Sequence, residues 1–303
     1  MSKQIKPTLC CDYDESKLKF PLILMPKIDG CRGINIDGKF TGRSLKPFKN
    51  KYITEKMSKE EYIGFDGEVA ADIWTSASLC RDTTSALNSI KGEPQVTWWV
   101  FDCIHPKVID MPYKERLAAA TTLIVALRVN TPTEQIQVVP WEMVYSVEEV
   151  EAADAKFLAQ GFEGTILRDP NGMHKSGRAT AKEGSYMRIK RFTDAEAVVL
   201  SIDEAMKNNN EAKVNELGRT ERSSHQENLE AKGMVGSLIC KCLETGETIT
   251  VGAGAMDHAE RTYYFENQSE IIGKTIKYKS FRKGVKNLPR FPTFLSIRAV
   301  EDM

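Results

Sequence analysis

The sequence predicts an α+β protein with two domains, a larger mixed domain over residues 1–192 and a small β-barrel over residues 193–303. A chain of 303 residues is long for one hydrophobic core. Strand-like segments alternate with helical segments in the first two thirds, whereas short strands follow one another after about residue 193. This change in pattern places the domain boundary near Phe192.

The first domain begins with a predicted β-hairpin. In GINIDGKFTGRS, Ile34 and Ile36 alternate with polar residues before Asp37-Gly38, a pair that favours two-residue hairpin loops. Two later segments, GFDGEVAADI and QVTWWVFDCI, are short and apolar and predict buried strands.

Two helices and a further strand complete this domain. Pro112 can open a helix through YKERLAAATTLIVAL, because the first turn of a helix tolerates proline. Ser146 and Glu149 form a capping box for a helix that stops at Gly161. The strand FEGTILR follows and is closed by the turn DPNG.

The second domain contains five short strand-like segments at intervals typical of a small barrel: AEAVVLSI, GSLICKCL, ETITVGAG, GKTIKYKSF and TFLSIRAV. Between the first two lies a polar, Asn-rich insertion at about residues 208–232. It shows no periodic pattern and could be a disordered loop, but an insertion of this length in a compact domain is more often functional.

Composition excludes several classes of protein. The chain is 41% apolar and 28% charged, and it has no apolar run near the ~18 residues of a membrane span, so we expect no membrane partner. Seven cysteines without framework spacing and a start that lacks a secretion signal favour a cytoplasmic location. Net charge is zero, yet residues 39–54 and 271–300 carry cations and no acids, which favours binding of phosphates.

A set of short motifs carries the chemistry. The first is KIDGCR, residues 27–32, which alone is also typical of a strand followed by a solvated turn. It is followed in order by GRS with Arg43, FDGEV with Glu68, WWVFDCI with Phe101, EGTILR with Glu163, SYMRIKRF with Lys190, and PRFPTFLSIR with Arg290 and Arg298.

This set, in this order, resembles the nucleotidyltransferase motifs of ATP-dependent DNA ligases, and the chain looks like the small viral and bacteriophage members. The resemblance covers nearly the whole chain, including LGRTERSSHQ and GVKNLPRFPTF. It implies an ATP-grasp-like nucleotidyltransferase domain, an OB-fold barrel, and a latch-like insertion. It also implies sealing of 3′-hydroxyl/5′-phosphate nicks in duplex DNA during replication, repair or recombination.

Lys27 is the nucleophile that the resemblance implies. A lysine amine can attack the α-phosphate of ATP and carry AMP through a P–N bond. Because a free lysine, with a pKa near ~10.4, is protonated at neutral pH, we expect nearby cations such as Mg²⁺ or arginine to favour the neutral amine.

The acidic and aromatic motif residues receive roles in the same way. Asp29 and Glu163 are oxygen donors that suit Mg²⁺, with Mn²⁺ as an alternative, and Glu68 can join them or accept from the ribose hydroxyls. Phe101 matches the residue that stacks on adenine, although core packing explains a ring in WWVF nearly as well.

The basic motif residues suit phosphates. Arg32 and Arg43 can bind phosphate oxygens in pairs, and Lys190 suits the α-phosphate. The family usually has Lys-x-Lys where this chain has Arg188-Ile189-Lys190, so an electrostatic role survives there but proton transfer does not. Met25 stands where small polar residues are frequent in the family. We expect this difference to have little effect on adenine binding, because the family contacts adenine there through backbone atoms.

The partner that the resemblance implies is nicked double-stranded DNA, encircled by a monomer. Arg290 and Arg298 would orient pyrophosphate, and a hinge at residues 191–195 would let the second domain turn toward DNA. We expect the insertion to be mobile without DNA and ordered on it. The predicted DNA-binding residues are Arg32, Arg43, Lys46, Lys49, Arg178, Arg219, Arg222 and Lys232.

Three alternatives remain open from the sequence. An mRNA-capping guanylyltransferase shares KxDG and an OB domain but takes GTP, and an RNA-end ligase lacks the OB strands. A noncatalytic nick-binding module could keep the fold. We expect ATP rather than NAD⁺, since NAD⁺ would require an additional N-terminal domain and 26 residues precede Lys27.

Overall fold

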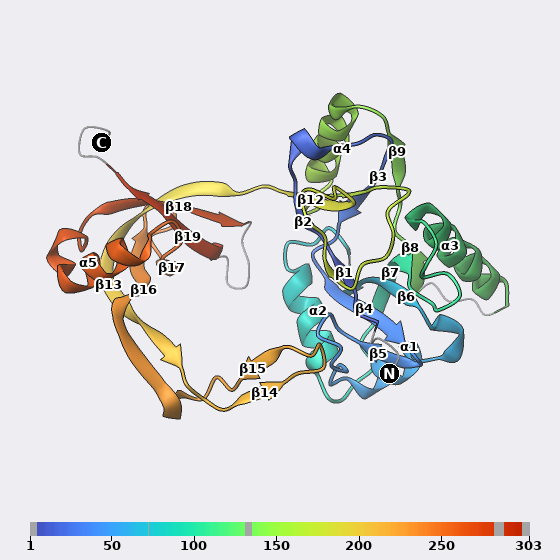
Figure 1. Ribbon diagram of the computed structural model, residues 1–303, viewed down its shortest axis with the longest axis horizontal. Helices are drawn as coiled ribbons and strands as arrows, with labels where there is room; N and C mark the ends of the chain where they lie inside the picture. The colour runs from blue at the N-terminus through green and yellow to red at the C-terminus, as the bar shows by residue number, and fades with distance from the viewer. Residues whose placement is uncertain (1–4, 72, 131–134, 282–287, 299–303) are drawn as a thin grey trace. The chain divides into compact units, whose positions relative to one another are not determined.

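The computed structural model describes residues 5–71, 73–130, 135–281 and 288–298. The chain divides into two compact units, Met1–Lys190 and Arg191–Met303 (Figure 1). Among the described residues, none of the helices combines the length and the apolar character needed to cross a membrane.

The first unit is built on two five-stranded sheets (Figure 1). One sheet has the order β2 (Cys11–Asp12), β12 (Tyr186–Lys190), β10 (Gly164–Arg168), β3 (Leu22–Lys27) and β9 (Glu142–Val144). The other has the order β5 (Lys39–Thr41), β4 (Cys31–Ile36), β6 (Phe65–Ala71), β7 (Val96–Cys103) and β8 (Ile136–Val138). A short parallel pair joins β1 (Thr8–Leu9) to β11 (Gly177–Arg178).

Four helices cover these sheets: α1 (Lys51–Met57), α2 (Leu79–Asn88), α3 (Tyr113–Asn130) and α4 (Val147–Ala159). Helix α3 begins directly after Pro112, as predicted, and packs on β7 and β8. Only half of the predicted capping box forms at α4: Ser146 accepts from the Glu149 amide (3.3 Å), but the Glu149 carboxylate accepts from the Tyr145 amide (2.8 Å), one residue before the cap, and not from the Ser146 amide.

The KIDGCR motif links the two sheets, because β3 ends at Lys27 and β4 begins at Cys31. Strand β3 runs between β10 and β9, which explains why Leu22–Met25 are all buried. The predicted hairpin joins β4 to β5, with Asp37 (φ 51°) and Gly38 (φ 75°) in the left-handed conformation that a two-residue type I′ loop requires.

The second unit is a closed five-stranded barrel (Figure 1). Its strands run in the order β13 (Thr193–Asn208), β16 (Leu229–Cys242), β17 (Thr248–Gly252), β19 (Arg290–Ile297) and β18 (Thr275–Phe281), with helix α5 (His258–Glu266) between β17 and β18. Val199, Leu238, Val251 and Ile276 are fully buried in the barrel core. The apolar alternation of these strands therefore reflects one face turned inward.

The insertion is folded, although its sequence shows no periodic pattern. Strands β13 and β16 continue as a pair as far as Asn208 and Leu229. Between them lies a small hairpin of β14 (Ala212–Val214) and β15 (Thr220–Arg222). Three short 3₁₀ turns elsewhere in the chain, Glu15–Lys17, Glu60–Tyr62 and Gln268–Glu270, and one in the insertion, Gln226–Asn228, complete the described elements.

Candidate active site

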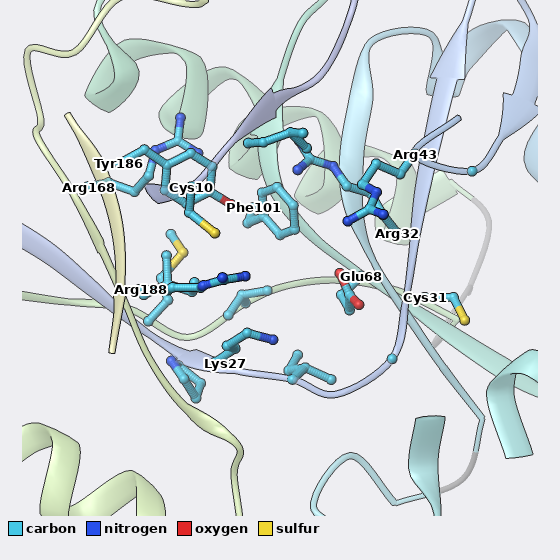
Figure 2. Close-up of a pocket in the computed structure, with 18 of the residues that line it drawn as sticks. Cys10, Lys27, Cys31, Arg32, Arg43, Glu68, Phe101, Arg168, Tyr186 and Arg188 are labelled. Carbon is cyan, nitrogen blue, oxygen red and sulfur yellow. The ribbon is translucent and has the colours of Figure 1, made fainter. Parts of the chain in front are cut away.

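A pocket of about 500 Å³ opens in the first unit and is lined from both sheets. Lys27 and Arg188 come from the sheet that contains β3, whereas Arg32, Glu68 and Phe101 come from the other sheet. Figure 2 shows the Lys27 and Arg188 side chains pointing into the space that Glu68 faces, with Phe101 above it. The pocket thus joins positive groups, one carboxylate and an aromatic ring.

Lys27 is the last residue of β3, where the chain turns toward the second sheet. Asp29 and Gly30 form that bend, and a Cβ on Gly30 would lie 2.1 Å from the Val69 carbonyl oxygen, so only glycine fits. Lys27 thus stands just before a bend that lies close against β6.

Glu163 lies between Lys27 and Lys190. In the pairing of β10 with its two neighbours, Gly164 stands opposite both lysines, so the residue before it is next to both. The Glu163 amide donates to the Lys27 carbonyl (3.1 Å), and its two carboxylate oxygens contact the Lys27 and Lys190 ammonium groups, one each. The strand register therefore explains why these three motif residues meet.

Carboxylates hold the proton on Lys27. Burial favours the neutral amine, but Glu163, Glu68 and Asp29 outweigh it and raise the pKa of Lys27. Burial likewise opposes the ionised form of Glu163, but the two lysines outweigh it and lower the pKa of Glu163. The sequence led us to expect cations that favour the neutral amine, whereas the charged groups that shift the pKa of Lys27 are acids.

Glu68 has the opposite balance. Burial raises its pKa to about 7, against the attraction of Lys27 and Arg32. It lies on β6 and pairs across the sheet with Arg32 on β4. A carboxyl group with such a pKa can accept a hydrogen bond or carry a proton near neutral pH.

Arg32 is held by Asp66, a residue that the sequence analysis did not single out. The Arg32 Nε donates to one carboxylate oxygen of Asp66 (2.7 Å), its Nη2 contacts the other, and its Nη1 donates to the Thr8 carbonyl (2.9 Å). The guanidinium carbon lies 5.0 Å from the centre of the Phe101 ring. The segment FDGEV carries both Asp66 and Glu68, so the motif could have indicated this partner.

Phe101 is supported from behind by Tyr113. The Tyr113 hydroxyl donates to the Phe101 carbonyl (2.8 Å) and lies 3.6 Å from the sulfur of Met25, which is 2% exposed. The predicted base-binding residues Met25 and Phe101 therefore share one buried support. Nothing in the single sequence indicated Tyr113, which begins a helix far from both.

A buried charge cluster joins the two sheets beside this support. Asp102 on β7 accepts from Arg168 on β10 (2.8 Å) and from Arg116 on α3 (2.8 and 3.1 Å). The Arg168 guanidinium lies between the rings of Tyr113 (3.8 Å) and Tyr186 (4.0 Å). Although burial opposes ionisation, the two arginines lower the pKa of Asp102 to about 2.

The remaining predicted residues fall into three groups. Arg43, Arg178 and Arg188 line the pocket, and Arg188 donates to Asp12 (2.8 Å). Lys46 and Lys49 are exposed between β5 and α1, whereas Asp29, Glu163 and Lys190 lie outside the pocket lining. The second unit contains Arg219, Arg222 and Lys232 of the insertion, Arg290, and Arg298, which donates to Glu196 (2.6 Å).

The predicted metal ligands do not form a closed protein cage. In the part of the chain that the structure describes, no group of three or more His, Cys, Asp or Glu side chains is arranged to hold a metal ion. Mg²⁺ is usually bound by one or two carboxylates together with waters and substrate phosphates. The oxygen donors of Asp29, Glu68 and Glu163 fit that chemistry, and their role as metal ligands remains a prediction.

Comparisons with known proteins agree with this geometry. The family described as ATP dependent DNA ligase domain matches residues 15–185, more than half of the chain, and the DNA ligase OB-like domain matches residues 229–298. A DNA ligase of African swine fever virus (strain Badajoz 1971 Vero-adapted) is 23% identical over 167 residues, which cover 54% of this chain and 39% of that protein. The match thus spans well under half of the viral relative.

Two solved structures cover this chain almost completely. Chlorella virus DNA ligase-adenylate is 25% identical, with 97% of this chain and 99% of that one covered and a TM-score of 0.53. A structure from an analysis of Lig E DNA ligases is 22% identical, with the same coverage and a TM-score of 0.72, and shows the likeness of fold. The chain belongs to the family of ATP-dependent DNA ligases.

Proposed function

We propose that this chain seals nicks in duplex DNA in three steps. The Lys27 amine attacks the α-phosphate of ATP, so that a P–N bond forms and the bond to pyrophosphate breaks. AMP then passes to the 5′-phosphate of the nick, and the 3′-hydroxyl attacks that phosphate and releases AMP. The observation that carries the proposal is the position of Lys27, at a strand end in a pocket that also presents Glu68, Arg32 and Phe101.

The first step requires Lys27 to lose a proton. Glu163 contributes most to raising the pKa of Lys27, so a cation that binds the Glu163 carboxylate lowers that pKa. Lys190 already shares this carboxylate. When bound, Mg²⁺ would neutralise phosphate charge, with Asp29, Glu68 and Glu163 as the residues to hold it.

Each wall of the pocket suits one part of the nucleotide. Phe101 offers apolar surface for the adenine base, the backbone at Met25 can contact it, and Glu68 offers an acceptor for the ribose hydroxyls. Arg32 and Arg188 offer planar forks for phosphate oxygens. Because Asp66 fixes Arg32 with two contacts, Arg32 is oriented before any ligand arrives.

The second unit would serve the reaction in two ways. Arg290 and Arg298 would orient pyrophosphate in the first step, and a hinge at residues 191–195 would then let the barrel engage DNA. The predicted contacts with DNA phosphates are made by Arg32, Arg43, Lys46, Lys49, Arg178, Arg219, Arg222 and Lys232 in a monomer that surrounds the duplex.

A labelling experiment tests the proposal. The protein is incubated with Mg²⁺ and α-labelled ATP or GTP, and nicked duplex is then added. We expect label from ATP on the wild type and none on Lys27→Ala, followed by loss of label as joined DNA forms. Label from GTP alone would favour the guanylyltransferase instead, and absence of label would favour the noncatalytic module.

A further inference from the structure

The hairpin of the insertion lacks a core of its own. Every residue from 211 to 230 is exposed or half-buried, and both strands of the hairpin are exposed throughout. Two-stranded hairpins without apolar burial are marginal in water. The order of this hairpin therefore depends on polar contacts at its root.

Asn210 supplies those contacts. It lies where the β13–β16 pair gives way to the hairpin, and it is 5% exposed among exposed neighbours. Its side-chain amide donates to the carbonyls of Ser223 (2.9 Å) and His225 (2.7 Å), and its side-chain oxygen accepts from Asn228 (3.2 Å). One side chain thus ties the start of the hairpin to the segment that follows it.

The neighbours of Asn210 close the same root. Asn208 donates from its side chain to the Ser223 carbonyl (2.8 Å), and the Asn209 amide donates to the Asn228 carbonyl (2.9 Å). The Arg222 guanidinium, at the end of β15, contacts the Asn210 carbonyl oxygen. The tilt of the hairpin on the barrel is therefore fixed by amide groups whose geometry is strict.

Orientation matters because the hairpin is electrically neutral. Residues 211–222 carry Lys213, Arg219 and Arg222 and an equal number of acids, Glu211, Glu216 and Glu221. Net charge cannot attract such a segment to DNA. Only a fixed orientation can turn its cations toward phosphates and its acids away from them.

We propose that Asn210 is a positioning residue that holds this hairpin for binding of nicked duplex and takes no part in Lys27 adenylylation. This inference rests on the proposed function, because it takes the insertion to contact DNA. Loss of the Asn210 side chain removes its donor to the His225 carbonyl and leaves the Ser223 carbonyl with Asn208 alone, which frees the hairpin to reorient. The proposal assigns a function to the Asn-rich root rather than to the cations alone.

The test compares Asn210→Ala and Asn210→Asp with wild type. The second variant keeps the shape of the side chain, loses both donors and adds a negative charge, whereas the first removes the side-chain amide without adding charge. We expect both to bind a nicked duplex about tenfold more weakly, to take label from ATP as wild type does, and to exchange amide hydrogens faster over residues 211–222. Asn267→Ala is the matched control, since Asn267 also donates to a backbone carbonyl (2.9 Å) but lies at the end of α5.

A variant that lacks the hairpin shows whether Asn210 acts through it. When residues 211–222 are replaced by two glycines, nick binding should weaken, and adding Asn210→Ala should then change nothing further. Wild-type affinity in both Asn210 variants, or an equal loss in the shortened background, would overturn the inference alone. A wild type that neither takes label from ATP nor binds nicked duplex would overturn the proposed function, and the inference with it.

Discussion

Lys27 is buried beside three acidic residues that raise its pKa, which favours the protonated amine. Glu163 dominates among them, and it is shared with Lys190. In the proposed reaction, a change in the charges around Glu163 would lower the pKa of Lys27 and favour the neutral, nucleophilic amine. This arrangement would limit reaction of the lysine with other electrophiles.

Tyr113→Phe tests the support behind the base. The substitution leaves the ring in place but removes the donor to the part-buried Phe101 carbonyl, so Phe101 and Met25 lose the hydroxyl that contacts both. We expect KM for ATP in lysine adenylylation to rise about fivefold to tenfold, with kcat within about twofold. Tyr62→Phe is the control, because Tyr62 is also buried but belongs to a core cluster separate from that of Tyr113 and is not part of the pocket lining. Equal effects of both variants would contradict a role in base binding.

Asp102→Asn tests the buried charge cluster. It leaves Arg116 and Arg168 without their shared carboxylate, so we expect the free energy of unfolding at pH 7 to fall by about 3–5 kcal/mol. In the folded protein the pKa of Asp102 is depressed to about 2 from 3.8. The stability that its ionised form contributes is therefore present above about pH 4 and is lost as pH falls toward 2.

The measurement is urea unfolding of both proteins between pH 3 and pH 7. The difference in unfolding free energy should be constant from about pH 5 upward and should shrink toward pH 3. A difference that grows as the pH falls would contradict the assignment of Asp102 as an ionised partner of the two arginines.

At the scale of elements, helix α5 depends on its cap. Asp257 accepts from the Glu260 amide (2.8 Å), and the Glu260 carboxylate accepts from the Asp257 amide (3.0 Å), which satisfies two otherwise unpaired donors. Asp257→Ala should lower the free energy of unfolding of the barrel by about 1 kcal/mol. Thermal unfolding checks this, and an unchanged melting temperature would show that the cap contributes nothing.

The sequence predicted those elements that depend on interactions between residues close together in the chain. Asp37-Gly38 specifies its hairpin loop because both positions need positive φ. The Ser146 side chain caps the start of α4 by accepting from the Glu149 amide. The resemblance implied a latch-like hairpin in the insertion, but no local pattern indicated it, since the hairpin buries no apolar face and so has no alternation to detect. Its root depends on Asn210 reaching carbonyls 13 and 15 residues away.

The sequence predicted which residues belong to the site, but it did not predict which of them touch. The motifs named Lys27, Glu163 and Lys190, but their meeting depends on the register that sets Gly164 opposite both lysines. Asp66, Tyr113 and Arg168 act through side chains brought together across two sheets. Spacing along the chain does not encode such distances.

At the scale of the whole molecule, the chain has two folded units with separate cores, and each contains residues for a different part of the proposed reaction. The pocket proposed to bind the nucleotide lies within the first unit, whereas the insertion and the last motif belong to the second. This division predicts that binding of DNA and attachment of AMP can be impaired separately. The cation-rich segments at residues 39–54 and 271–300 belong to different units.

Salt should weaken DNA binding steeply because cations that neutralise phosphates release condensed counterions. We expect the logarithm of the affinity for nicked duplex to fall linearly with the logarithm of salt concentration. Replacing both Lys46 and Lys49 with glutamine should reduce that slope by roughly one to two. Fluorescence anisotropy at several salt concentrations measures it, and a slope that does not depend on these lysines would remove them from the DNA contacts.

The most direct measurement is mass spectrometry of the protein after incubation with ATP and Mg²⁺. We predict one adenylate per chain, located on the peptide that contains Lys27, and none on Lys27→Arg, which keeps the charge opposite Glu163 but cannot readily lose its proton. An adenylate on another residue, or an unmodified wild type, would contradict the role of Lys27 as the covalent carrier.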